Sequence, residues 1–328
     1  MKSAGRILIV VLMAILLASI TGIQPPSAQA SADPAAPPIP FKVSATSLLL
    51  PSSIMAPCNP DFYGIELGSF PACNDYWTKQ GWSLATLSQY ETNGFIYLAG
   101  SFQKGGKRRA KWGMSQAAFE KLNKSYVGSG EGWRVDQLNV LTTDKGQFYA
   151  AIWAEDLKLA WENYNMMLQP EFDKRFAAME TEGWNMVDVA SYRVRTILAG
   201  QPYWAVRWSG TWLGVGAGSG KVHDNITLTG FNNRDKNYAA QGLQVTRFIT
   251  YRGDSREGSP ILHAAIWRPK TSLPSGTWKS MPVTTFPEFQ KMYDAITPQG
   301  YRLYYINVYE DLVSAIWIKP FILKVPGH

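Results

Sequence analysis

The chain has 328 residues, a formal net charge of +7, and a composition of 46% hydrophobic and 17% charged residues. This balance excludes a disordered chain, and the length allows about two domains. The mild charge excess does not predict a nucleic-acid binder. With two cysteines and three histidines, we expect neither a metal site nor a cofactor. The 13 tryptophans are unusually many and need an explanation.

The first 30 residues are typical of a secretory signal peptide. Lys2 and Arg6 precede an apolar run, residues 7–20, which is shorter than the roughly 20 residues that a membrane-spanning helix needs. A small-residue cleavage site follows at residues 28–30. We therefore expect a secreted protein with no transmembrane anchor after cleavage, when the loss of two cations lowers the charge from +7 to +5. A retained membrane anchor is the alternative.

Residues 31–60 are rich in proline and predict an extended linker. In an oxidising compartment Cys58 and Cys73 are expected to form a disulfide that ties this linker to the first folded unit. Two free buried thiols are the alternative. We assign the folded domain to residues 61–320 and a tail to residues 321–328.

Five copies of one pattern fill the chain between Phe70 and Pro320. In the fifth copy Phe289, Tyr293 and Ile296 share one face of a helix, and a glycine four residues later suits the end of that helix. The five copies cover approximately residues 61–104, 112–155, 165–210, 225–269 and 278–320. The glycines that end the expected helices are Gly81, Gly132, Gly183, Gly242 and Gly300.

A β-hairpin is predicted after each of these glycines. Apolar residues recur one, three, six and nine positions downstream, which is strand spacing broken by one step of three. A β-bulge would return these side chains to one face at the cost of one extra residue. A second apolar segment then ends in a large aromatic residue: Phe102, Trp153, Trp208, Trp267 and Trp317. We predict an α+β tandem array of five helix–hairpin repeats with antiparallel strands, which bury their apolar faces against their neighbours.

This pattern resembles a tandem repeat of secreted bacterial proteins. It is also similar to the N-terminal repeats of the fungal polyglycine hydrolases, and the Ala-Ala-Ile-Trp strand ends carry most of the resemblance. The resemblance implies antiparallel, half-barrel-like repeats. In those hydrolases a separate β-lactamase-like catalytic domain follows the repeats. Only eleven residues follow Trp317 here, so we expect that catalytic domain to be missing.

No catalytic constellation stands out in the sequence. Ser101 and Lys104 have the spacing of a β-lactamase nucleophile and base, but they fall at the end of a strand instead of on a helix. The acid pairs 155–156 and 310–311 fit solvated turns, and His263 fits a packed strand position. Whether the chain is an enzyme stays open at this point, and a non-enzyme is favoured.

The candidate binding residues are basic or aromatic. Residues 104–111, here called the basic segment, are expected to be exposed. They form either a solvated connector or a contact surface for anionic material. Four tryptophans fall in connectors, where they could stack on a ligand or fill gaps between repeats. The candidate binding residues are Lys104, Lys107, Arg108, Arg109, Lys111, Trp112, Trp212 and Trp278.

Two functions remain open from the sequence. One is an exported, non-catalytic repeat module whose partner is an extracellular polymer or protein, with anionic cell-wall material as one candidate. The other is a secreted hydrolase, a peptidase or serine hydrolase related to the polyglycine hydrolases, with a site assembled across repeats.

Overall fold

The computed structural model describes residues 58–129, 131–155, 160–214, 220–254 and 259–320. The expected signal peptide, most of the expected linker and the expected tail lie outside these residues. Each repeat consists of a strand, a helix and a β-hairpin. The five predicted helix–hairpin units are therefore confirmed, and each has one further strand at its start. Among the described residues, no helix is long and apolar enough to cross a membrane.

The elements recur in the same order in all five repeats. The first strands are β1 (Asp61–Glu66), β4 (Arg108–Met114), β7 (Trp161–Met167), β10 (Lys221–Ile226) and β13 (Gly276–Thr285). The helices are α2 (Phe70–Lys79), α3 (Gln116–Gly128), α4 (Gln169–Thr181), α5 (Leu228–Ala240) and α6 (Phe286–Ile296), with short 3₁₀ turns at Lys270–Ser272 and Thr297–Gln299. The hairpins are β2 (Trp82–Thr92) with β3 (Phe95–Lys104), β5 (Trp133–Thr143) with β6 (Gly146–Glu155), β8 (Asn185–Leu198) with β9 (Gln201–Leu213), β11 (Leu243–Arg252) with β12 (Ile261–Pro269), and β14 (Arg302–Tyr309) with β15 (Leu312–Pro320).

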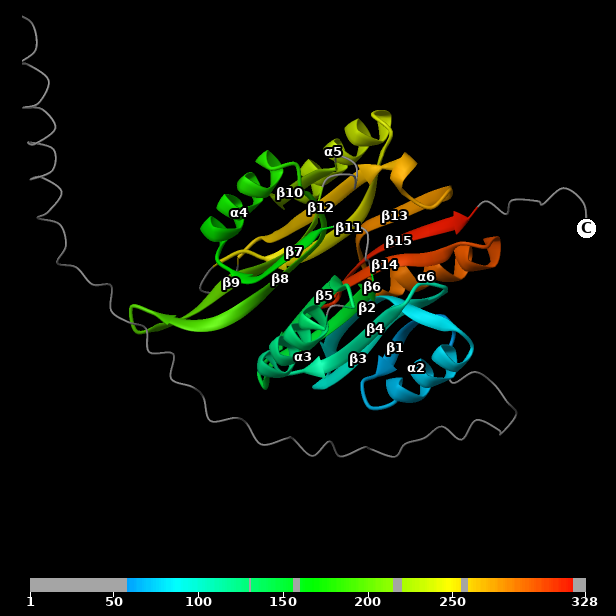
Figure 1. Cartoon of the computed structure of the whole chain (residues 1–328), viewed down its shortest axis with the longest axis horizontal. Coiled ribbons are helices and arrows are strands. Elements are labelled where there is room, and N and C mark those ends of the chain that lie inside the picture. Colours follow the sequence, from blue (N-terminus) through cyan, green and yellow to red (C-terminus); the bar gives the residue numbers. More distant parts are fainter. Residues whose placement is uncertain (1–57, 130, 156–159, 215–219, 255–258, 321–328) are drawn as a thin grey trace, which may run out of the picture. The chain divides into compact units, whose positions relative to one another are not determined.

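Each repeat forms its own three-stranded antiparallel sheet. The last strand of the repeat lies in the middle, between the first strand and the first hairpin strand, as in the order β1–β3–β2. The five helices lie around the outside of the strands (Figure 1). The five sheets stay separate among the described residues and do not merge into a closed barrel. The half-barrel form that the resemblance implies stays a prediction.

The predicted β-bulge is present in the first hairpin strand of every repeat. In β2, for example, the pairing register shifts between Leu84 and Thr86. The same shift falls at the equivalent position in the other four hairpins. It lets residues three, six and nine positions after the capping glycine share one buried face, as Leu84, Leu87 and Tyr90 do. The irregular spacing therefore belongs to the fold of the repeat.

The helix faces and caps also follow the sequence pattern. Phe289, Tyr293 and Ile296 of α6 are all buried, as an apolar stripe at steps of four and three requires. Each of the five glycines that follow the helices has a positive φ, between 73° and 86°. In this left-handed conformation a side chain would be strained, which explains a glycine at the turn from helix to strand.

The first hairpin strands of the repeats contact one another in a ring. β2 contacts β5, β5 contacts β8, β8 contacts β11, β11 contacts β14, and β14 contacts β2. At three of these junctions, the side chain five residues after the capping glycine accepts a hydrogen bond from an amide of the preceding repeat. The pairs are Leu87 N to Gln137 Oε1 (2.9 Å), Leu138 N to Asp188 Oδ2 (3.0 Å) and Ile306 N to Thr86 Oγ1 (3.3 Å). The last of these joins the fifth repeat to the first.

An ion pair with a buried carboxylate strengthens that closing junction. Asp61 of β1 is 3% exposed and accepts two hydrogen bonds from the Arg302 guanidinium, each at 2.8 Å. It also accepts the backbone amide of Leu303 at 3.1 Å. Ser101 donates to the Leu303 carbonyl at 2.8 Å and is fully buried. The Ser101 hydroxyl is therefore used structurally, as expected from its place on a strand.

The third repeat differs from the predicted repeat pattern in its core tryptophan. In the other four hairpins the core aromatic residue pairs with the residue three positions after the capping glycine, as Trp153 does with Val135. In the third hairpin Met186 occupies that position, and its partner is Trp212 instead of the expected Trp208. Trp212 is therefore a core residue, 1% exposed, and its assignment to a connector was wrong. Four extra residues in the strand after the turn caused the misalignment.

The first strand of each repeat was not expected. β4 includes Arg108, Arg109 and Lys111, and its register shifts between Lys111 and Met114. This charge and the bulge hide the alternation that identifies a strand. The basic segment therefore contributes to an edge strand of a sheet. The expected disulfide between Cys58 and Cys73 is present and joins the start of the described chain to α2.

Candidate functional site

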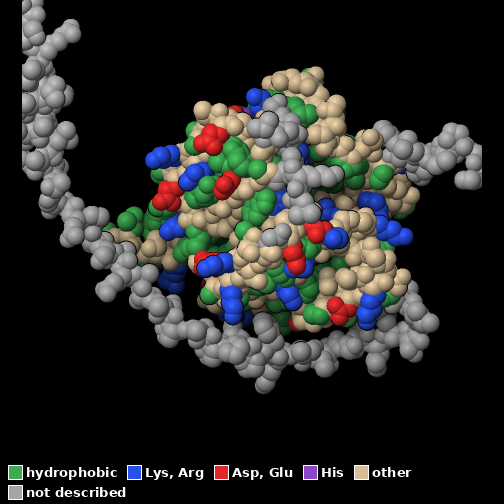
Figure 2. All heavy atoms as spheres, viewed as in Figure 1, with side chains coloured by type: hydrophobic (Ala, Val, Ile, Leu, Met, Phe, Trp, Pro, Cys, Tyr) green, Lys and Arg blue, Asp and Glu red, His purple; other side chains and the backbone are tan. Residues whose placement is uncertain are grey.

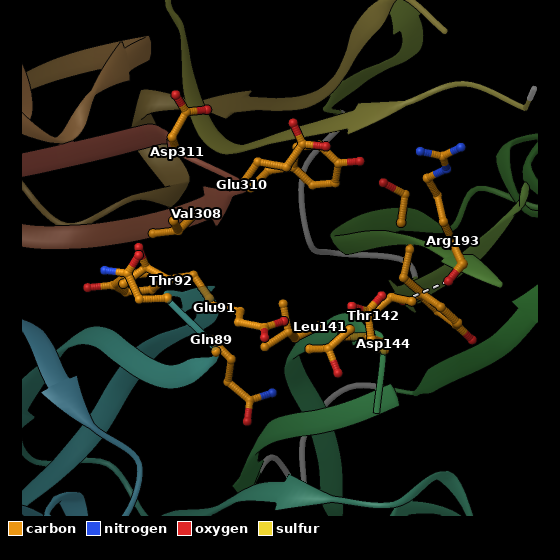
Figure 3. Close-up of a pocket in the computed structure, with 18 of the residues that line it drawn as sticks. Gln89, Glu91, Thr92, Leu141, Thr142, Asp144, Arg193, Val308, Glu310 and Asp311 are labelled. Atoms are coloured by element: carbon orange, nitrogen blue, oxygen red, sulfur yellow. Dashed lines mark hydrogen bonds between the residues drawn. The ribbon is translucent and has the colours of Figure 1, made fainter. Parts of the chain in front are cut away.

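A large cavity lies where the hairpins turn, at one end of the ring of contacting strands. Its volume is about 900 Å³, and we call it the cup. The first, second, third and fifth repeats contribute lining residues, so the cup exists only in the assembled ring. Figure 3 shows Gln89, Glu91 and Thr92 on one side, and Asp144 and Arg193 on the other. A volume of this size is typical of sites for small ligands or single side chains.

The wall of the cup between the second and third repeats is held by hydrogen bonds. Thr142 Oγ1 donates to the Arg193 carbonyl at 2.6 Å, as the dashed line in Figure 3 marks. The Arg193 guanidinium lies 5.1 Å from the centre of the Trp204 ring. Both residues belong to the β8–β9 hairpin, which extends beyond the neighbouring hairpins in Figure 1. The extra length of this hairpin therefore places a cation and an indole at the cup.

Carboxylates surround the opening of the cup. Glu91 is the next-to-last residue of β2, Asp144 lies in the β5–β6 turn, and Glu310 and Asp311 form the β14–β15 turn. Glu310 binds Arg252 in a two-pronged ion pair with both distances at 2.9 Å. These hydrogen bonds hold the pKa of Glu310 below its usual value. The expectation that the 310–311 pair occupies a turn is confirmed.

Tyrosines in the cup stay neutral over the ordinary pH range. Burial raises the pKa of Tyr90 to about 12, and burial together with the nearby Glu310 raises the pKa of Tyr309. The ring of Tyr90 packs against Phe286 at 4.9 Å and Tyr97 at 5.8 Å. The cup therefore combines carboxylates with neutral aromatic rings.

A second group of charged residues is buried between the strands, away from the residues that line the cup. Arg247 Nε donates to Asp188 Oδ1 at 3.0 Å, and Arg134 Nη1 donates to Asp136 Oδ1 at 2.8 Å. Burial opposes the charge on Asp136, but Arg134, Arg108 and Arg247 outweigh this effect and lower its pKa. Burial raises the pKa of Asp188, and Arg247 opposes that rise. We call Asp136, Asp188 and Arg247 the ionic core.

The basic segment is largely paired within the protein. Lys107 lies 2.9 Å from Glu155, Arg108 lies 3.8 Å from Asp136, and Arg109 lies 3.1 Å from Glu131. Arg109 also lies over the Trp133 ring at 4.2 Å, and Lys104 lies 5.7 Å from the centre of Trp82. Lys111 is exposed. Figure 2 shows Lys and Arg interspersed with acidic side chains on the face in view.

The remaining candidate residues pack within the protein. Trp112 meets Phe70 edge-on at 4.6 Å, and Trp278 meets Tyr304 at 4.7 Å. Trp212 is buried against Tyr164 and Phe172. The structure does not bring these three rings into the cup.

Sequence reasoning did not select the cup. Its residues come from turns and strand ends, where acids and threonines are ordinary surface residues. The one available signal was a shared position ten residues after the capping glycine. The residues there are Glu91, Thr142, Arg193, Arg252 and Glu310, and all but Arg252 line the cup. These residues can be recognised as neighbours only once it is known that the first hairpin strands contact one another in a ring, which the sequence does not show.

Groups that would indicate a metal site were not found in the described part of the chain. It holds no cluster of three or more metal-ligating side chains. His263 is 2% exposed and contacts Thr250, while His223 bonds Tyr238 at 2.7 Å, and neither histidine lines the cup.

Comparison with known proteins gives one result on the repeats. No curated protein matches the chain. Residues 105–156 and 284–320 match the family described as "Polyglycine hydrolase-like, structural repeat". The first segment spans β4 to β6, and the second spans α6 to β15 with the end of β13. The second and fifth repeats are therefore similar to the polyglycine hydrolase-like structural repeat.

Proposed function

We propose that this protein is an exported, non-catalytic repeat module that binds an extracellular polymer or protein in the cup. The observation that carries the proposal is the cavity of about 900 Å³ that residues from four different repeats build together. A concave site that the fold holds open can bind a ligand without rearrangement. The disulfide agrees with an extracellular location.

The cup is a better binding site than the basic segment. Two cations of that segment, Lys107 and Arg109, already form ion pairs with carboxylates of the same chain. An anionic polymer would have to replace those contacts before it gained any of its own. In contrast, the cup is a cavity of about 900 Å³ that is lined by Glu91, Asp144 and Asp311.

Pull-down and cleavage assays on the same samples test this function. The protein is incubated with insoluble cell-wall material and with soluble polypeptides, and bound protein and released fragments are measured. We expect binding without cleavage. Cleavage that is abolished by a substitution in the cup would overturn the proposal and favour the alternative, a hydrolase with a site assembled across repeats.

A pair of bulky substitutions locates the binding site. Thr92→Trp places an indole at the mouth of the cup, and Thr229→Trp places the same group on the exposed side of α5. We expect the first variant to lose most of the binding and the second to bind as the unmodified protein does. Equal binding by both variants would show that the cup is not the site.

A further inference from the structure

The cup differs in charge from the rest of the protein. The whole chain has 32 Lys and Arg against 25 Asp and Glu. Among the residues that line the cup the balance is reversed, with Arg193 facing the four carboxylates Glu91, Asp144, Glu310 and Asp311. Walls of low dielectric strengthen the field of charges that share a cavity. The cup is therefore an electronegative cavity in a basic protein.

The protein neutralises part of this negative charge. Arg193 lines the cup, and Lys145 donates to the carbonyl of the cup residue Gly94 at 3.3 Å. Glu310 and also Asp311 raise the pKa of Arg252. Glu310 is paired with Arg252. Glu91, Asp144 and Asp311 form no ion pair with another described residue. Three carboxylates on three different hairpins thus remain able to meet a cation inside one cavity.

The aromatic residues of the cup suit a cation better than a sugar. A sugar ring stacks on the flat face of an aromatic side chain, but Arg193 already covers Trp204, and Phe286 packs against Tyr90. A cation can instead approach a neutral tyrosine while its charge meets a carboxylate. Tyr309 lines the cup and is only partly buried, and burial together with Glu310 raises its pKa and keeps it neutral.

We propose that the cup binds a cationic side chain, the ammonium of lysine or the guanidinium of arginine, presented by an extracellular polypeptide. Glu91, Asp144 and Asp311 are the carboxylates that this group meets. The cavity has room for the side chain with its adjoining backbone. This inference rests on the proposed function and names the class of ligand that the same site takes.

Peptide titrations test the inference. Fluorescent hexapeptides of lysine, of glutamate, and of alternating serine and glycine are titrated with the protein at low and at physiological salt. We expect the lysine peptide to bind at least about 10-fold more tightly than the serine–glycine peptide, since two or more ion pairs add up to that ratio. We expect this difference to shrink as salt rises.

A charge-neutral variant and a control variant identify the residues. The triple variant Glu91→Gln, Asp144→Asn, Asp311→Asn should lose about 10-fold or more in affinity for the lysine peptide. Glu66→Gln removes an exposed acid of β1 that does not line the cup and should change nothing. Unfolding curves on each variant confirm that it is folded.

The results separate this inference from the proposed function. If the triple variant binds the lysine peptide as the unmodified protein does, or if no hexapeptide binds, the inference is wrong. If Thr92→Trp abolishes binding of an uncharged polymer that the triple variant still binds, the cup is a binding site but not for cations. Tighter binding of an amino-sugar oligomer than of the lysine peptide would overturn the choice of a polypeptide.

Discussion

The ionic core and the cup handle charge in opposite ways. In the ionic core Asp188 is 2% exposed and meets Arg247 at 3.0 Å. In the cup Glu91, Asp144 and Asp311 lie at an open cavity without an ion pair to another described residue. The same ring of strands supports both regions. The comparison teaches that buried charges hold neighbouring repeats together, whereas unpaired charges at the turns are available to a ligand.

The largest effect should come from breaking the ionic core. Arg247→Met leaves the Asp188 carboxylate buried, with the Leu138 amide as its remaining hydrogen-bond partner among the described residues. We expect a loss of about 3–5 kcal/mol in the free energy of unfolding, measured in urea. Adding Asp188→Asn to this variant should recover part of the loss. A loss below about 1 kcal/mol would show that water reaches this pair.

A pH titration should reveal another buried group outside the cup. Burial lowers the pKa of His263 to about 4, whereas an unfolded histidine titrates near 6.5. The unfolded chain therefore binds the extra proton first, and stability is full above pH 6.5 and falls as the pH drops toward 4. We expect this group to contribute up to about 3 kcal/mol of that loss.

His263→Leu is the matched control for the pH effect, because Leu98 occupies the equivalent position of the first repeat. In this variant, denaturant unfolding between pH 6.5 and 4 should show a shallower decline. An unchanged decline would assign the effect to other groups.

Two ion pairs of similar geometry compare burial with exposure. Asp61→Ala removes three hydrogen bonds at the closing junction and should cost about 2–3 kcal/mol, since the Leu303 amide is left buried without a partner. Glu310→Ala removes a pair with Arg252 in which the Glu310 side chain is 44% exposed, and should cost less than about 1 kcal/mol. Thermal unfolding of both variants checks this order. Equal costs would contradict it.

The smallest change in stability should come from the cup acids. Each of the substitutions Glu91→Gln, Asp144→Asn and Asp311→Asn should alter the free energy of unfolding by no more than about 0.5 kcal/mol. The same samples should show the largest change in peptide binding. If these substitutions destabilise the protein strongly, the carboxylates have structural partners, and the contrast with the ionic core fails.

The local features of the fold could be predicted from the sequence because they depend on nearby residues. The helix stripe of Phe289, Tyr293 and Ile296, the capping glycines and the bulge each leave a signal within about fifteen residues. The β4 strand could not be predicted in the same way, because its charges pair with acids from distant segments, as Arg108 does with Asp136. Its identity as a strand depends on β6, about forty residues further on.

The cup was beyond sequence reasoning for a related reason. Glu91 and Asp311 are 220 positions apart and look like ordinary turn acids. They share a cavity only because the fifth repeat meets the first. The third hairpin shows the same limit on a smaller scale. Trp208 and Trp212 are both buried, and the register of the hairpin decides which of them pairs with Met186.

The ion pair between Asp61 and Arg302 also bears on how many repeats such a ring can accommodate. An open row of repeats can gain or lose a member at either end, because each unit contacts only its neighbours. Here the first and fifth repeats contact each other, so neither has an end that is free to bind another repeat. A sixth repeat could join only if the Asp61–Arg302 ion pair and the Thr86–Ile306 hydrogen bond were broken first. Extra residues are therefore accommodated more easily at the hairpin turns. There a hairpin can lengthen, as β8 and β9 have done, without disturbing the contacts between the first hairpin strands.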